Sequence, residues 1–267
     1  MFADLIPAPY TPFAGISDGA TIIVFIPSFV GFFSRGLFGF GSNMLIIIVI
    51  TWILGPHHAV LLTVLTTSVA QIHLFPQGIK TADWKLARTL IFGQIIGIAA
   101  ATWVFISLKA DWLTFLLGVL VALNVLMDRY QLLTRLGRYI DMRGTATVSG
   151  LAVSSGMLGT LSGGGGIYIL IPYLKLSCGD SPTLRGTAIA LSGFFIYARL
   201  AALAVAGAFA PHMLVEAALI LPAVFLGTWG GTRLFRAISA ERFYGFLQFF
   251  LIAAAMALIG RGLWKTL

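Results

Sequence analysis

The chain has 267 residues, of which 59% are hydrophobic and only 10% are charged, and its formal net charge is +8. About a quarter of the residues of a soluble domain are charged, so this composition excludes a water-soluble globular enzyme and a disordered chain. The basic residues lie in short gaps between apolar runs, which is typical of membrane topology and argues against nucleic-acid binding.

The first half of the chain predicts helices of unequal length. Residues 20–33 form an apolar run, and the glycine-rich stretch 36–41 separates it from a short apolar run at 44–54. A helix needs about 20 residues to cross the apolar core of a bilayer, so both runs are too short to span it alone. Three longer runs follow, and we expect them to be spanning helices: 59–75, 90–108 and 112–127.

The second half repeats this order, with an apolar run at 145–158, a glycine-rich stretch at 159–166 and a short run at 167–176. Three longer runs complete it: 186–210, 213–229 and 243–259. Pro56 matches Pro182, and the helices after them match at an offset of 126 residues. The predicted fold class is therefore an all-α polytopic membrane protein with two repeats of five helical elements each. The glycine-broken pair of each repeat is either discontinuous or re-entrant, and the sequence leaves both open.

Lysine and arginine predict how the halves face the membrane. Twelve of the 17 basic residues fall in four gaps, which the positive-inside rule assigns to the cytoplasm. The expected division is an extracytoplasmic segment 1–19, a first repeat 20–127, a cytoplasmic linker 128–144, a second repeat 145–260 and a tail 261–267. Both termini are periplasmic in this arrangement, and the two repeats are inverted relative to each other.

The two glycine breaks predict an anion site. A break frees backbone N–H groups that hydrocarbon cannot satisfy, and a helix N-terminus adds a partial positive charge. Interrupted helices in matching positions of inverted repeats place a transporter's binding site near the middle of the membrane. The alternative is that the glycines only permit close helix packing. The backbone positions expected at the site are Gly41, Ser42, Asn43, Gly163, Gly164, Gly165 and Gly166.

Polar side chains inside the apolar runs are further candidates. Arg199 is the charged residue of the run 186–210, and its guanidinium suits a sulfite or sulfonate. The alternative is a structural ion pair with Glu216, which is also a candidate proton carrier for coupling. The repeat offset pairs Arg199 with His73, the second coupling candidate. It also pairs polar residues that we expect either to bind substrate or to form interhelical hydrogen bonds: Gln71 with Tyr197, and Thr66 with Ser192.

The glycine patterns resemble a known family. Gly36-Leu-Phe-Gly-Phe-Gly-Ser-Asn43, followed by an apolar run and Pro56, resembles the first half-signature of the TauE/SafE family, also called the 4-toluene sulfonate uptake permease family. The stretch from Gly156 to Gly166, with Pro172, resembles the second half-signature. The resemblance covers about residues 20–260 and implies an all-helical inner-membrane carrier for sulfite, sulfonates or related anions. Ser42 and Asn43 stand where glycines are common in that family, and both side chains can donate hydrogen bonds to an oxyanion.

The expected function is secondary transport of a sulfur-containing anion, sulfite or an organosulfonate, by alternating access in a bacterial inner membrane. The expected partners are this anion, the lipid bilayer and protons as a candidate coupling ion, while a monomer and a homodimer both stay open. A passive anion channel with the same central site is the main alternative, and an intramembrane enzyme is a weaker one.

Enzymatic activity, cofactors and metals are not expected. No candidate nucleophile has an assigned general base, and the near-matches to intramembrane protease motifs are incomplete. His57 and His58 lie together at a turn, and the sequence shows no further cysteine, histidine or carboxylate near them that would complete a metal site.

Overall fold

The computed structural model describes residues 12–13, 18–38, 42–130, 132, 135, 144–164, 166–234 and 240–266. These residues form helices and short connections, without a β-strand among them, which confirms the all-α prediction. The helices are α1 (Asp18–Phe38), α2 (Ser42–Leu54), α3 (Pro56–Thr81), α4 (Trp84–Ser107), α5 (Ala110–Arg129), α7 (Thr145–Leu161), α8 (Ile167–Ser177), α9 (Ser181–Val205), α10 (Pro211–Leu234) and α11 (Ala240–Thr266).

Local chemistry sets where several helices begin. Pro56 occupies the first turn of α3 after Gly55, whose φ of 85° suits a residue without a side chain. The Asp83 carboxylate caps α4 by accepting hydrogen bonds from two backbone N–H groups of its first turn. Asp180 caps α9 in the same way, accepting from the Thr183 N–H. Each cap satisfies donors that a membrane helix would otherwise leave unpaired at its end.

Within the described residues, five helices are long and apolar enough to cross a membrane. Their candidate spans are Pro56–Pro76, Trp84–Ser107, Ala110–Met127, Pro182–Val205 and Pro211–Arg233, and a shorter apolar stretch of α11 runs over Phe249–Trp264. By contrast, α2 has 13 residues and α8 has 11, so neither reaches across a bilayer alone. Short helices after a glycine break therefore occur in both halves, as the sequence predicted.

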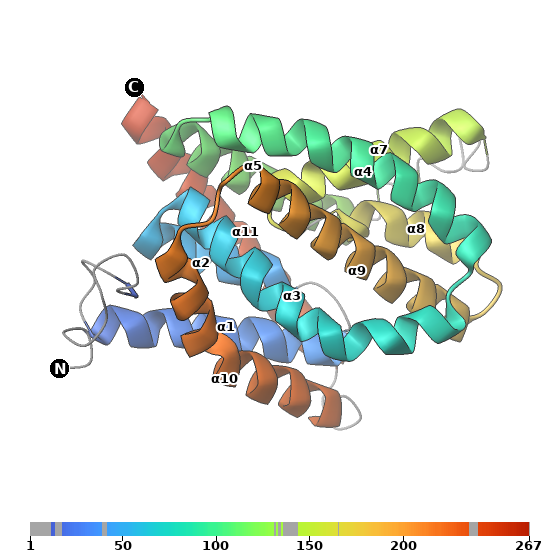
Figure 1. The fold of residues 1–267 in the computed structure, drawn as a ribbon, viewed down its shortest axis with the longest axis horizontal. Helices are drawn as coiled ribbons and strands as arrows, with labels where there is room; N and C mark the ends of the chain where they lie inside the picture. The colour runs from blue at the N-terminus through green and yellow to red at the C-terminus, as the bar shows by residue number, and fades with distance from the viewer. Residues whose placement is uncertain are drawn as a thin grey trace.

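The most extensive helix contacts join the first half of the chain to the second half. The most extensive contacts join α4 to α7, α1 to α10, α5 to α11 and α3 to α9. In the predicted repeat, α1 corresponds to α7 and α4 to α10, so the first two contacts are equivalent, and the last two join corresponding helices. Figure 1 shows α3 and α9 running beside each other through the middle of the bundle. This pattern is what two equivalent halves would produce, while their inversion across a bilayer stays a prediction.

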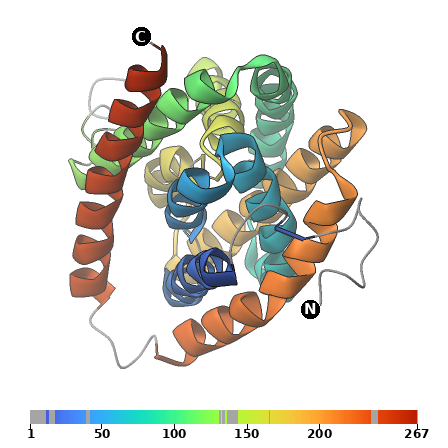
Figure 2. The same ribbon diagram turned by 90° about the vertical axis from the view of Figure 1, so that its left-hand side faces the viewer.

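Helix α2 lies inside the bundle. Its apolar residues include Ile46, Ile47, Ile48 and Ile50, and each has an exposed fraction of 1% or less. A helix that is apolar on all sides must be covered on all sides. In Figure 2, α2 lies within a ring of longer helices, with α10 and α11 along the edge. This burial places the beginning of α2 in the protein interior.

The bundle has two distinct ends. Helix α1 begins and α11 ends at one end, whereas the turn from α3 to α4, which carries Lys80 and Lys85, lies at the opposite end (Figure 1). We call the first the outer end, following the predicted topology. Helices α3 and α10 also begin there.

Candidate functional site

The beginning of α2 is in direct contact with the second glycine break. Asn43, in the first turn of α2, donates a hydrogen bond from Nδ2 to the carbonyl oxygen of Gly163 at 3.0 Å. The Thr67 hydroxyl donates to Asn43 Oδ1 at 3.2 Å and fixes the orientation of the amide. Gly164 has φ of 145°, and a Cβ there would lie only 2.6 Å from Asn43 Nδ2. Only glycine accommodates both this backbone conformation and this approach.

A cavity of about 30 Å³ lies where the beginning of α2 meets the second glycine break. Asn43 and Ile167 both line it, so the N-termini of α2 and α8 face the same space. Helix N-termini carry partial positive charge and attract anions. The volume accommodates a water molecule or a compact ion better than a large organic molecule. The lining residues are Arg35, Asn43, Gln94, Gly164, Ile167, Ser192, Phe195 and Ile196.

Arg35 supplies the positive side chain of this cavity. It lies near the end of α1 with an exposed fraction of 4%, and one of its terminal nitrogens donates to Gln71 Oε1. The Gln71 amide in turn donates to the Ile189 carbonyl at 3.2 Å, so α3 and α9 hold this partner in place. Arg35 Nε has no hydrogen-bond partner among the described residues. A buried guanidinium thus retains an unused donor beside the cavity.

Sequence analysis did not assign Arg35 to the site. The signal was present, because Arg35 is the basic residue between the apolar runs 20–33 and 44–54, directly before the Gly36 motif, and is a functional candidate by the reasoning applied to Arg199. Gln94 was also left out of the site prediction. It lies on α4, at the position where that helix packs closely against Gly156 of α7.

Gln94 adds an acceptor to the cavity. Its Nε2 donates to Ser155 Oγ at 3.1 Å, and Ser155 Oγ donates to the Gly166 carbonyl at 2.8 Å. Because the hydroxyl hydrogen is used on Gly166, Ser155 must accept from Gln94, which fixes the amide orientation. Gln94 Oε1 is then left without a partner within the described part of the chain.

Arg199 is buried elsewhere. Its exposed fraction is 2%, and a terminal nitrogen donates to the Thr160 carbonyl at 2.8 Å. Thr160 is in the last turn of α7, just before the second glycine break. A cation at this position satisfies a helix C-terminal carbonyl and the negative end of the helix dipole. The side chain that lines the cavity is Arg35, and Arg199 instead supports the shape of the break.

The other predicted site residues are divided between several locations. Ser192 lines the cavity with Gly164, while the Gly163 and Gly166 carbonyls accept the hydrogen bonds described above. Thr66 donates to the Leu62 carbonyl of its own helix, which is the usual local bond of a helical threonine. The Tyr197 hydroxyl donates to the Ser68 carbonyl at 3.3 Å.

Four predicted positions do not contribute to the described cavity. Gly41 and Gly165 lie outside the described residues, and Ser42 is placed only as the first residue of α2. His73 is exposed and lines a separate groove between α3 and α10. The structure therefore does not bring His73 together with Arg199 at the cavity.

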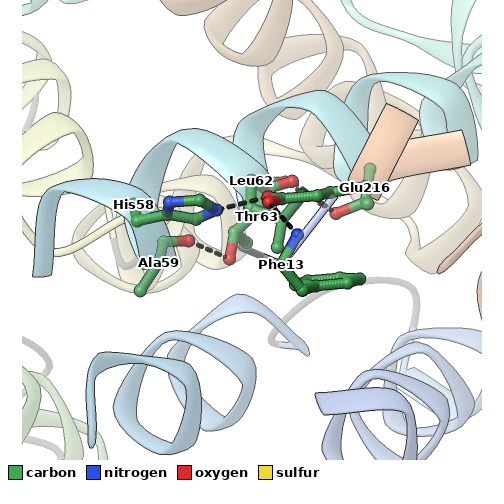
Figure 3. Close-up of polar contacts among 7 residues, drawn as sticks. Phe13, His58, Ala59, Leu62, Thr63 and Glu216 are labelled. Carbon is green, nitrogen blue, oxygen red and sulfur yellow. Dashed lines mark hydrogen bonds and ion pairs between the residues drawn. The ribbon is translucent and has the colours of Figure 1, made fainter. Parts of the chain in front are cut away.

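Glu216 lies in another cluster, at the outer end. It has an exposed fraction of 1%, accepts a hydrogen bond from the Phe13 backbone N–H at 2.8 Å and contacts His58 Nε2 (Figure 3). His58 and Gln71 are 13 residues apart on α3, so the cluster lies about 20 Å along that helix from the Arg35–Gln71 contact. Glu216 is thus paired with His58 and not with Arg199.

The expectation that His58 lacks further metal-ligand residues was wrong. Folding brings His212 and Glu216 of α10 to His58 of α3. The sequence separation of more than 150 residues hid this proximity from a search for local patterns.

The fold and the cavity indicate the class of protein. The described residues include five apolar helices of spanning length, as in a multi-pass membrane protein, and a small cavity that the N-termini of the short helices α2 and α8 line. The family model described as "Sulfite exporter TauE/SafE" matches residues 23–258. The chain therefore belongs to the TauE/SafE sulfite exporter family, and the resemblance found in its glycine patterns is confirmed. This family consists of membrane transporters and not of enzymes. Searches of curated proteins and of solved structures each found no match.

Proposed function

We propose that this protein is a secondary transporter of a small sulfur-containing oxyanion, sulfite above all, and that it works by alternating access. The observation that carries the proposal is the Arg35 guanidinium beside a small cavity at the meeting point of the two glycine breaks. Family membership supports the transport of sulfite or a related anion, and the cavity supports a particular place for it.

The charge balance favours an anion in this cavity. Within the described part of the chain, Arg35 forms no ion pair with a carboxylate. A buried, uncompensated charge is costly in a membrane protein, and a bound oxyanion would supply the missing counter-charge. Arginine also binds oxyanions through two parallel N–H groups, and Nε is available for one of them. The N-termini of α2 and α8 would stabilise the same negative charge.

The acceptor on Gln94 favours an anion that carries a hydroxyl group. A fully ionised oxyanion has only acceptor atoms, so it would face Gln94 Oε1 with repulsion and leave that atom unpaired. A protonated monoanion such as hydrogensulfite would donate to Gln94 while its other oxygens accept from Arg35. Among the described residues that line the cavity, Arg35 is the positive side chain, and its charge matches one negative charge. We therefore propose hydrogensulfite as the bound form, ahead of sulfate or a bulky organosulfonate.

Binding of hydrogensulfite has a consequence for coupling. A carrier that moves this ion moves a proton with sulfite, so proton coupling does not require a separate carboxylate relay. Glu216 and His73 were the predicted coupling residues, and neither lines the cavity. The remaining topology belongs to the same proposal: a bacterial inner membrane, periplasmic termini, and two inverted repeats at 20–127 and 145–260.

The test is sulfite counterflow in proteoliposomes. Wild-type protein is expected to exchange labelled sulfite against internal sulfite, and Arg35→Gln is expected to lose this exchange. Arg185→Gln, a substitution at the first turn of α9, is the charge-matched control and is expected to leave exchange unchanged. Counterflow separates a carrier from a passive channel, because a channel dissipates the gradient without exchange. Sulfite exchange by a folded Arg35→Gln variant at the wild-type rate would refute the proposed site.

A further inference from the structure

A second cluster of chemically active side chains lies at the outer end of the bundle. His58, His212 and Glu216 each offer one ligand atom, and these three atoms lie within 4.8 Å of one another. The rings of His58 and His212 also lie close, with centroids 5.7 Å apart. This cluster is separate from the Arg35 cavity and shares no residue with it.

The helices bring these groups together by a simple arrangement. His212 and Glu216 are four residues apart at the beginning of α10, so they lie on the same helix face. His58 lies in the first turn of α3, which packs against α10. Two imidazoles and one carboxylate are a donor set that binds zinc in proteins, with a fourth position left for water.

The carboxylate is already held as a metal ligand would be. The Phe13 N–H donates to Glu216 Oε1, which leaves Oε2 directed at His58 (Figure 3). Phe13 is itself packed in the hydrophobic cluster around Ala59, Leu62 and Ala217, so its N–H is fixed in place. A ligating carboxylate is usually oriented by such an outer hydrogen bond.

The site is also reachable. Glu216 is buried, whereas His58 and His212 are each partly exposed. Zinc bonds to nitrogen and carboxylate oxygen are about 2.0–2.2 Å long, so an ion would separate Glu216 from His58 and draw His212 inward. Binding would release any proton shared by the His58–Glu216 contact.

We propose that His58, His212 and Glu216 form a site for a divalent transition-metal ion such as Zn²⁺. This inference does not depend on the proposed transport function. A consequence that does depend on it concerns regulation. Helices α3 and α10 belong to different halves of the chain, so a bound ion would cross-link their outer ends and slow alternating access.

The first test measures binding to the purified full-length protein in detergent, with Zn²⁺ alone as the probe and chelator competition as the assay. We expect one ion per chain and an increase in melting temperature. His212→Ala is the decisive variant, because it removes one ligand and leaves the His58–Glu216 contact intact. We expect it to weaken Zn²⁺ binding at least about tenfold.

The matched control is His57→Ala. His57 is the neighbour of His58 in sequence, but its Nε2 contacts the Phe105 carbonyl and it is not part of the cluster. Its removal is expected to leave the affinity for Zn²⁺ unchanged. The same protein is expected to bind Mg²⁺ poorly, because this ion prefers oxygen ligands. Absence of Zn²⁺ binding, or an equal loss in His57→Ala and His212→Ala, would overturn the proposed site.

The second test concerns regulation and uses sulfite counterflow with Zn²⁺ added on the outer side. We expect inhibition of the wild type and relief in His212→Ala. If wild-type protein binds Zn²⁺ but transports equally well with it, the site stands and the cross-linking effect is refuted. If no sulfite transport occurs at all, the proposed function fails and the binding result still decides the metal site.

Discussion

The two buried arginines, Arg35 and Arg199, differ in what surrounds them. Both have exposed fractions below 5% and both lie in helices beside a glycine break. Both leave Nε without a hydrogen-bond partner among the described residues. Arg199 donates to a helix-terminal carbonyl, whereas Arg35 lines a cavity together with an unpartnered amide oxygen and two helix N-termini. A buried charge in a membrane protein therefore does not identify a ligand site by itself. A neighbouring cavity and an unused acceptor beside it are needed as well.

The largest expected difference is in anion affinity. Arg35→Gln removes the positive side chain of the cavity and is expected to weaken sulfite binding by about 30-fold or more, as the loss of one partner of a buried charge pair does. Arg35→Lys keeps the charge without the planar fork and should give an intermediate loss. Calorimetric titration of the detergent-purified variants measures both. Equal sulfite affinity in the wild type and Arg35→Gln would show that Arg35, like Arg199, does not bind the anion.

Arg199→Gln is expected to act on stability instead. Loss of the Thr160 contact leaves a buried carbonyl poorly satisfied and should lower the free energy of unfolding by about 1–3 kcal/mol. Sulfite affinity of the folded fraction should change less than in Arg35→Gln. Thermal unfolding together with titration distinguishes the effects. A larger loss of affinity in Arg199→Gln than in Arg35→Gln would reverse the assignment of roles.

Gly164→Ala should disturb the cavity from the backbone side. The left-handed φ and the approach to Asn43 both oppose a Cβ, and strain of this kind costs about 1–3 kcal/mol. Gly260→Ala is the control, because a Cβ there meets nothing within 4 Å and alanine favours a helix. The melting temperature of Gly164→Ala should fall, whereas that of Gly260→Ala should rise or stay the same.

Gln94→Met should change selectivity more than affinity. The substitution removes the acceptor that we assign to a hydroxyl-bearing anion, so the preference for sulfite at mildly acidic pH over sulfate should fall by about tenfold. Competition binding with both anions measures this ratio. An unchanged ratio would show that the Arg35 side of the cavity selects its ligand without Gln94.

The smallest effect is expected at Asp180, which caps the helix that carries Arg199. Hydrogen bonds from Thr183 lower the pKa of this exposed carboxyl. A lowered pKa contributes stability above the ordinary aspartate value of about 4, and this contribution is lost as pH falls through the pKa of the folded state. Asp180→Asn keeps a capping side chain, so its melting temperature should depend less on pH in that range. Identical pH profiles would show that the cap contributes nothing through its charge.

The sequence predicted most of the fold and part of the site. Apolar runs predicted the helices, and glycine patterns predicted both short helices. The same patterns predicted an anion site that includes Asn43 and Gly164; the structure places both residues at the cavity, and anion binding there stays a prediction. The repeat offset could not indicate which face of a helix is buried. Gln71 and His73 are two residues apart, which is a rotation of about 200° on a helix. One is accordingly buried at the Arg35 contact, and the other is exposed.

The packing of helices from the first half of the chain against helices from the second half has a consequence for biosynthesis. Helices α1 and α2 leave the ribosome long before α10, against which α1 makes its most extensive contact. Helix α1 therefore lacks its main packing partner until the second half of the chain has been synthesised. A chain truncated after α5 should be degraded rapidly by membrane proteases. Its coexpression with the separate second half should restore both fragments to the membrane.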